Sequence, residues 1–188
     1  MNIKASVLGI FIVAISVSAS TAQELPTPFT TPTSDMVFNA KEIVISSDYT
    51  SEEENSVDSI MTPSPADKIK QRLSDIFFAT TEGTDVLNFT ITDASIKEEH
   101  TKSDSWFKRG QFKYSANFAL NMQLVDSKGK VIVSAICKSW GARTISDNSS
   151  IEEREKSLSD MTDKLIDSLI LQVREESEKG FKPYLKAK

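Results

Sequence analysis

Residues 112–125 read FKYSANFALNMQLV, and this stretch decides the fold. Its apolar side chains occupy one parity and its polar side chains the other. This alternation has the two-residue period of a β-strand, in which successive side chains point to opposite faces. The apolar set consists of Phe112, Tyr114, Ala116, Phe118, Leu120, Met122 and Leu124. The stretch therefore predicts a long strand with one buried face and one polar face.

Further strands are predicted on both sides of this one. Residues 126–129, DSKG, indicate a hairpin turn, in which glycine supplies the positive φ that such loops often require. Residues 131–145 return as the partner strand. Residues 86–96, VLNFTITDASI, alternate in the same way, and residues 37–46 are compatible with a first strand. Together these stretches predict a sheet with one apolar face.

Two amphipathic helices accompany the strands. The first begins at Ser64 and Pro65, which suit a helix cap and the first helical position. Its apolar stripe consists of Ile69, Leu73, Ile76 and Phe77, and residues 82–84, EGT, end it. The second helix covers residues 151–179 and begins with a capping box of Ser150 and Glu153. At 1.5 Å per residue it is about 43 Å long, which matches the long strand at about 3.3 Å per residue.

The predicted order is β-α-β-β-β-α, and it indicates an α+β fold. We expect a two-layer sandwich, with a mainly antiparallel sheet and both helices packed on one face. The polar face and the edge strands are then left over for a partner. Residues 35–188 form this single domain, and the acidic residues 48–62 are interpreted as a long, mobile loop.

The amino-terminal residues are typical of a secretory signal peptide. Residues 1–22 combine one basic residue, Lys4, with a short apolar run and small side chains before a cleavage site near Ala22. The apolar run is shorter than the roughly 20 residues that span a membrane, and an uncleaved anchor is the alternative. Gln23 stands where a lipidated cysteine would be needed. We therefore expect a periplasmic protein with a Pro/Thr-rich tether at residues 23–34 and no membrane anchor after cleavage.

Composition excludes several classes of protein. The chain has 22 basic and 27 acidic residues and a net charge of −5, which argues against binding to nucleic acid. One cysteine and one histidine cannot form a disulfide within the chain or most metal sites. Glycine-rich phosphate loops and nucleophile-elbow motifs are missing from the sequence. The sequence therefore predicts no metal, no cofactor and no enzymatic activity.

Residues 106–109 form a candidate partner-binding patch. Trp106, Phe107, Lys108 and Arg109 combine aromatic rings with positive charge, which suits lipid head groups or an acidic partner. The alternative is a loop whose aromatic rings fold back onto the core.

A candidate ligand site lies between the helices and the long strand. Its expected lining residues are Phe112, Phe118 and Met122.

Three residues carry reactive groups. Asp93 shares its parity with Phe89 and Ile91, so an inward-pointing carboxylate could support a hydrolase. The alternative is a strand end or bulge with local hydrogen bonds. His100 is a general base or a solvated loop residue. Cys137 lies within a predicted strand and is interpreted as a buried, inert thiol.

Four short stretches resemble uncharacterised exported envelope proteins of Gram-negative bacteria. They are FTITDA at 89–94, VDSKG at 125–129, IEERE at 151–155 and PYL at 183–185. The element order is also similar to that of outer-membrane-assembly and ABC-transport auxiliary lipoproteins, which are non-catalytic partners of lipid-transport machines. The resemblance implies an accessory protein that binds an envelope protein or a lipid-transport complex. A carrier of small ligands or lipids and a carboxylate-dependent hydrolase are the alternatives.

Overall fold

The computed structural model describes residues 35–51, 55–102 and 110–186. The strands are β1 (Met36–Phe38), β2 (Glu42–Ser47), β3 (Phe77–Ala79), β4 (Val86–Thr101), β5 (Gln111–Val125) and β6 (Val131–Ser146). The helices are α1 (Pro65–Ile76), α2 (Ile151–Lys179) and the short 3₁₀ turns η1 (Asp58–Ile60) and η2 (Lys182–Tyr184). The predicted signal peptide and tether lie outside the described residues.

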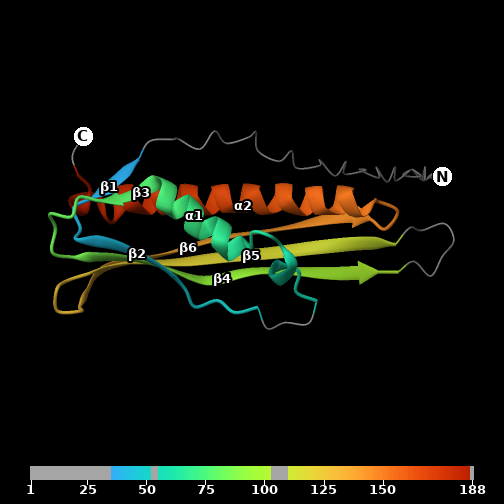
Figure 1. Cartoon of the computed structure of the whole chain (residues 1–188), viewed down its shortest axis with the longest axis horizontal. Helices are drawn as coiled ribbons and strands as arrows, with labels where there is room; N and C mark the ends of the chain where they lie inside the picture. Colours follow the sequence, from blue (N-terminus) through green and yellow to red (C-terminus); the bar gives the residue numbers. More distant parts are fainter. Residues whose placement is uncertain (1–34, 52–54, 103–109, 187–188) are drawn as a thin grey trace, which may run out of the picture.

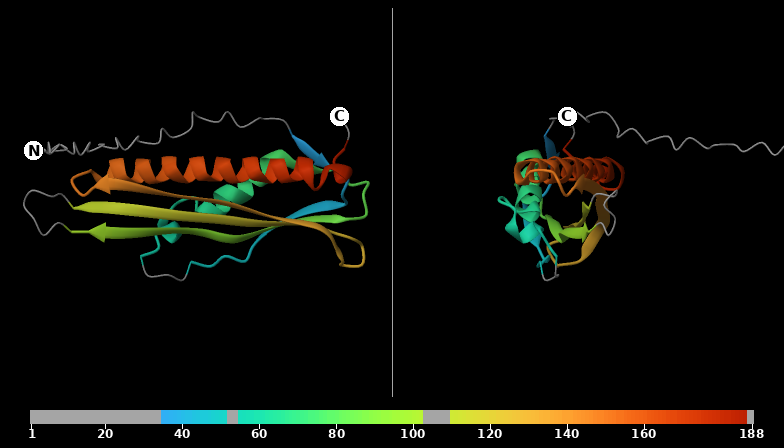
Figure 2. Two further views of the ribbon diagram at one scale, coloured as in Figure 1. Left: turned by 180° about the vertical axis from the view of Figure 1, so that it is seen from behind. Right: turned by 90° about the vertical axis from the view of Figure 1, so that its right-hand side faces the viewer.

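The main sheet has the strand order β2-β4-β5-β6 (Figure 1). β2 pairs with β4 in parallel, whereas β4, β5 and β6 pair antiparallel. Both helices lie on the same side of this sheet, as the end-on view of Figure 2 shows. The α+β fold with two layers is therefore confirmed, with a mixed and mainly antiparallel sheet.

β5 is the central element of the core. Its buried side chains are Tyr114, Ala116, Phe118, Leu120, Met122 and Leu124. The alternation of residues 112–125 thus appears as predicted, with Phe112 half-buried near the beginning of the strand. Helix α2 contributes Ile166, Leu169, Ile170 and Val173 to the same core, and its predicted capping box is present. Burial of apolar surface between β5 and α2 is the main source of stability.

Helix α1 ends earlier than predicted. It stops at Ile76, and Phe77 begins strand β3, which pairs in parallel with β1. Phe77 has the extended angles φ −107° and ψ 124°. Its ring packs near Phe38 and Phe89, with centroid distances of 6.3 and 5.1 Å. Because strand geometry places this large ring in the core, burial overrides the helical spacing of the sequence.

The predicted first strand, residues 37–46, is divided into β1 and β2, which belong to different sheets. At the break, the Asn39 N–H donates to the Tyr184 carbonyl at 2.7 Å, and the Lys41 N–H donates to the Asp85 carbonyl at 2.7 Å. Gly83 packs against this break, because a Cβ atom there would lie 2.5 Å from the Asn39 carbonyl oxygen. These contacts turn the chain from one sheet to the other.

A bulge in β4 reverses the expected direction of Asp93. The register with β5 shifts between Ile91 and Asp93, so Ala94 and Ile96 continue the buried face. Asp93 therefore lies on the outer face, and its carboxylate accepts a hydrogen bond from the Ser95 N–H at 3.0 Å. The expectation of an inward-pointing Asp93 is wrong, and the bulge alternative describes the structure.

The described residues of the acidic loop, 48–51 and 55–62, include the short turn η1 and hydrogen bonds to β4. The Val57 N–H donates to the Ile96 carbonyl at 2.9 Å, and the Glu98 N–H donates to the Asn55 carbonyl at 3.0 Å. Asp58 is buried and accepts hydrogen bonds from Tyr49, Ser56 and the Ile96 N–H. The described part of the loop is therefore hydrogen-bonded to β4, and its mobility stays a prediction.

Candidate functional site

β6 presents different kinds of side chain to its two faces. Its pairing with β5 places Ala135, Cys137, Ser139 and Gly141 on the inner face, opposite the core residues Met122, Leu120, Phe118 and Ala116. These inner residues are small, and α2 packs over them. A Cβ atom on Gly141 would lie only 3.1 Å from a methyl carbon of Leu165. Small side chains on this face therefore let α2 lie close to β6.

Several large apolar side chains of β6 are exposed on the outer face of the sheet, whereas Val133 and Ile145 pack against the core. Ile132, Ile136 and Trp140 recur every fourth residue, and 41%, 66% and 78% of their surfaces are exposed. We call these residues the β6 outer row. Isolated exposed apolar residues are common, whereas an aligned group on one face is typical of an interaction surface.

Polar side chains of β5 flank the β6 outer row. Asn117 lies directly opposite Trp140, and Asn121 lies opposite Ile136. Side chains of such cross-strand pairs point to the same face of the sheet. Their amide groups supply donors and acceptors beside an apolar strip, which is the usual composition of a recognition surface.

The free edge of β6 is partly covered by α2. The Lys138 N–H donates to Gln172 Oε1 at 3.1 Å, and Arg143 Nη1 donates to the Ser157 carbonyl at 3.2 Å. Capping of an edge strand in this way opposes the addition of a further strand. The outer face of β6, rather than its edge, is therefore the surface open to a partner.

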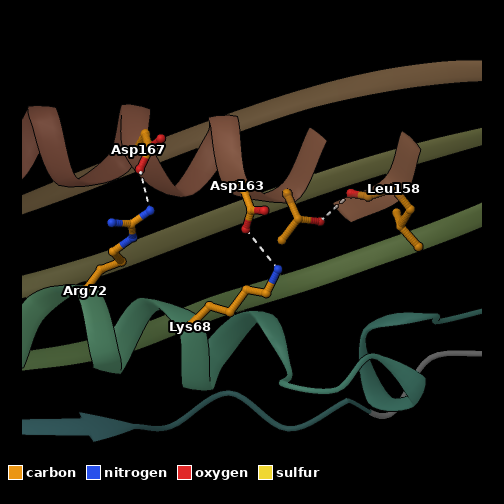
Figure 3. A network of polar contacts seen from close by, with 6 residues as sticks. Lys68, Arg72, Leu158, Asp163 and Asp167 are labelled. Atoms are coloured by element: carbon orange, nitrogen blue, oxygen red, sulfur yellow. Dashed lines mark hydrogen bonds and ion pairs between the residues drawn. The ribbon is translucent and has the colours of Figure 1, made fainter. Parts of the chain in front are cut away.

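A second polar feature joins the two helices (Figure 3). Lys68 Nζ lies 2.9 Å from Asp163 Oδ1, and Arg72 Nη2 lies 3.5 Å from Asp167 Oδ1. Burial raises the pKa of Asp167 above its ordinary value, and the positive charge of Arg72 offsets only part of this increase. A cavity of about 270 Å³ beside these pairs is lined by Pro63, Lys68, Gln71, Arg72, Asp75, Asp163 and Ile166. Because these ion pairs join oppositely charged side chains of α1 and α2, we interpret them as a link between the helices.

The structure separates the predicted ligand-lining residues. Phe118 and Met122 are buried in the core, and neither lines the cavity between the helices. Phe112 lies at the beginning of β5, where its ring stacks on His100 with a centroid distance of 4.3 Å. Their role in ligand binding stays a prediction. The patch of Trp106, Phe107, Lys108 and Arg109 lies outside the described residues.

The thiol of Cys137 is buried in the core. Burial raises the pKa of this thiol to about 11, and the nearby charge of Glu176 raises it further. Within residues 35–51, 55–102 and 110–186, His, Cys, Asp and Glu side chains form no group of three or more that could hold a metal. In the same part of the chain, neither long helix combines the length and apolarity needed to cross a membrane.

Sequence reasoning missed the β6 outer row. Residues 131–146, VIVSAICKSWGARTIS, carry apolar side chains at both parities, so periodicity alone does not identify the buried face. Only the register with β5 places Ile136 and Trp140 outside. The signal in the sequence that indicates the inner face is the small size of Ala135, Cys137, Ser139 and Gly141, which alternate with Ile136 and Trp140.

No family model and no curated protein match the sequence. Solved structures with a similar arrangement include rare lipoprotein B from Shewanella oneidensis, with 14% identity over 72% of this chain and 96% of that chain, and a TM-score of 0.44. Another is a minor lipoprotein from Acinetobacter baumannii, with 10% identity over 80% and 99% of the two chains and a TM-score of 0.40. Both are named as bacterial lipoproteins.

Proposed function

We propose that the protein is a non-enzymatic, exported accessory protein that binds another envelope protein through the β6 outer row. The observation that carries this proposal is the exposure of Ile136 and Trp140 beside Asn121 and Asn117 on the outer face of the sheet. Full burial of an isoleucine stabilises a protein by roughly 1.5–3 kcal/mol, and these side chains forgo most of that stabilisation in the isolated chain. A partner that covers them would recover it.

The chemistry of the row suits a protein partner. Tryptophan is among the residues that contribute most to binding at interfaces, and its ring combines a large apolar area with an N–H donor. Asn117 and Asn121 stand beside Trp140 and Ile136 and offer hydrogen bonds at the margin of the contact. An apolar centre with a polar margin is the common arrangement of specific interfaces.

The non-enzymatic part of the proposal has support from the surroundings of the reactive groups. The Asp93 carboxylate is engaged by the Ser95 N–H on an outer bulge. The Cys137 thiol is buried and has a raised pKa, which disfavours the nucleophilic thiolate. The His100 ring stacks on Phe112, with a centroid distance of 4.3 Å. Each group has a structural explanation that needs no catalytic role.

Export to the periplasm has support from residues 1–22, which carry the basic start, apolar run and small exit residues of a signal peptide. The resemblance drawn from the sequence indicates the class of partner, an envelope protein or a lipid-transport complex. The β6 outer row is the surface that we assign to this contact.

Photocrosslinking in the cells that make the protein tests the proposal. A photoreactive phenylalanine analogue is placed at Ile136, and in a matched variant at Val44, which is exposed on β2 at the opposite edge of the same sheet. We expect one discrete crosslinked envelope protein from position 136 and none from position 44. Equal labelling from both positions, or none from position 136, contradicts the proposal.

A further inference from the structure

A second cavity lies where strands β4 and β5 extend beyond α1, beside the first turns of α2. Its volume is about 170 Å³. The lining residues are Val57, Ile60, Glu98, Tyr114, Ile151, Arg154, Glu155 and Leu158. Neighbouring strands provide Glu98 and Tyr114, which face each other across the β4–β5 pair. The sheet therefore forms the floor of the cavity, and α2 forms one wall. The other wall is formed by Val57 and Ile60 of the acidic loop, called the anchored loop below because it is hydrogen-bonded to β4.

Four of the eight lining residues are aliphatic: Val57, Ile60, Ile151 and Leu158. Val57 and Ile60 are brought to the cavity by the anchored loop, which buried Asp58 fixes through its hydrogen bonds. Ile60 and Ile151 remain 78% and 66% exposed although both line the same cavity. Apolar groups in this arrangement favour an apolar ligand over water.

Arg154 supplies an unused hydrogen-bond donor in this cavity. Its guanidinium carbon lies 4.4 Å from the centre of the Phe112 ring, which holds the side chain in place. The Nε atom of Arg154 is buried and has no hydrogen-bond partner. A buried donor without an acceptor is costly, so a ligand that brings an acceptor gains more here than at a solvated arginine.

The acidic neighbours of Arg154 are already engaged or solvated. Burial raises the pKa of Tyr114 to about 12, and a hydrogen bond to Glu98 raises it as well. Glu98 therefore has the Tyr114 hydroxyl as a partner. Glu155 is exposed, so solvent screens its charge. Arg154 lies beside the same hydroxyl and partly offsets these effects on the pKa of Tyr114 through its positive charge and a hydrogen bond. The guanidinium is therefore held at the cavity by Tyr114 and Phe112, while its Nε donor has no partner.

We propose that this cavity binds a small hydrophobic carboxylic acid, with its carboxylate on Arg154 and its alkyl or aryl group against Ile151, Leu158 and Val57. Arginine N–H groups match the geometry of a carboxylate. A cavity of about 150 Å³ holds one benzene molecule, so the apolar part of the ligand is one ring or about six carbons. The proposal is independent of the β6 outer row, which lies on the other face of the sheet.

Titration followed by methyl NMR tests the site. The whole mature chain is titrated with sodium octanoate, octylamine and sodium butanoate, while the methyl signals of Ile151, Leu158 and Val57 are recorded. We expect saturable shifts with octanoate, and at least tenfold weaker binding of octylamine and of butanoate. Shifts of equal midpoint with octylamine overturn the carboxylate assignment, and the absence of saturable shifts with octanoate overturns the site.

Two variants separate the role of Arg154 from a general effect on folding. Arg154→Gln is expected to weaken octanoate binding at least tenfold, as expected for the loss of a charge-assisted hydrogen bond. Arg72→Gln removes an arginine from the helix pair and is expected to leave octanoate binding unchanged. Circular dichroism checks that both variants are folded. Unchanged affinity in folded Arg154→Gln contradicts the proposal.

The natural source of the carboxylate has its own experiment. A free fatty acid and the hydrophobic carboxyl-terminal residue of a peptide offer the same chemistry. Octanoate is therefore compared with a short peptide that ends in phenylalanine and with the same peptide as its amide. Tighter binding of the free-acid peptide than of octanoate identifies a peptide terminus, and the reverse identifies a fatty acid. Equal binding of the amide and the acid contradicts the role of the carboxylate.

Discussion

Strands β5 and β6 are neighbours of similar length, but they distribute their side chains in opposite ways. β5 directs Phe118, Leu120 and Met122 into the core and shows polar groups outside. β6 directs small residues toward α2 and leaves Ile136 and Trp140 outside. The difference teaches that stability depends on the inner face of β5, while the outer face of β6 is free to serve recognition.

The largest expected effect is on the inner face of β5. Phe118→Ala removes a fully buried ring and leaves a cavity, so we expect it to lower the free energy of unfolding by about 3–5 kcal/mol. Urea denaturation measures this change. Asn117→Ala is the matched control on the outer face of the same strand, with an expected change within about 0.5 kcal/mol. Equal losses in the two variants would show that the two faces of β5 are not distinct.

Asp58→Asn tests a site outside both strands, the anchor of the loop. Tyr49 donates to one carboxylate oxygen of Asp58, and Ser56 and the Ile96 N–H donate to the other. Asparagine replaces one of these oxygens with an NH₂ group, which cannot accept, and it removes the negative charge that strengthens the remaining hydrogen bonds. We expect a loss of about 1.5–3 kcal/mol at neutral pH, the range for hydrogen bonds to a charged group. Urea denaturation at pH 7 measures it, and a loss below about 0.5 kcal/mol would contradict the anchoring role.

The same variant has a predicted pH dependence. Burial alone would raise the pKa of Asp58, but the hydrogen bonds of Ser56, Ser51, Tyr49 and the Ile96 N–H lower it below its ordinary value of 3.8. The stabilisation by the carboxylate is therefore complete above pH 3.8 and is lost as the pH falls through the lower folded-state pKa. The difference in the free energy of unfolding between the original protein and Asp58→Asn should therefore become smaller in acid. A difference that grows in acid would reverse the assigned pKa shift.

A smaller effect is expected on the inner face of β6. Gly141→Val inserts a branched side chain where Leu165 already lies 3.1 Å from the position of a Cβ atom. Overpacking of this kind costs about 1–3 kcal/mol. Ala142→Val, on the exposed outer face, is the matched control with an expected change within about 0.5 kcal/mol. If both variants are equally stable, close packing of α2 does not explain the small residues of β6.

The sequence predicts the parts of this fold that repeat a simple period. The alternation around Phe118 and the capping box at Ser150 each follow from local rules, and both appear in the structure. It fails where tertiary burial decides. Phe77 fits a helical stripe but is buried in a strand, and Asp93 changes sides because a bulge inserts one residue. Such choices depend on partners distant in the sequence.

The candidate site was harder to predict than the fold. Ile136 and Trp140 belong to a strand that is apolar at both parities, and only its pairing partner shows which side is exposed. Arg154 and Ile60 are separated by a long stretch of chain and meet at one cavity. Their proximity depends on the anchoring of the loop by Asp58, which an acidic, irregular sequence does not reveal.

The variant that tests the β6 outer row is expected to have the smallest effect on stability. In the double variant Ile136→Ser/Trp140→Ser, both side chains are already exposed, so we expect the free energy of unfolding to change by less than about 0.5 kcal/mol per site. Partner binding should be lost, because the apolar centre of the surface is gone.

The most direct measurement places the photoreactive residue at Lys138, between the two substituted positions on β6, in the native row and in the double variant. Retained stability together with loss of the crosslinked envelope protein in the double variant is the predicted result. A double variant that still crosslinks the same protein with equal yield would contradict the assignment of the β6 outer row as the binding surface.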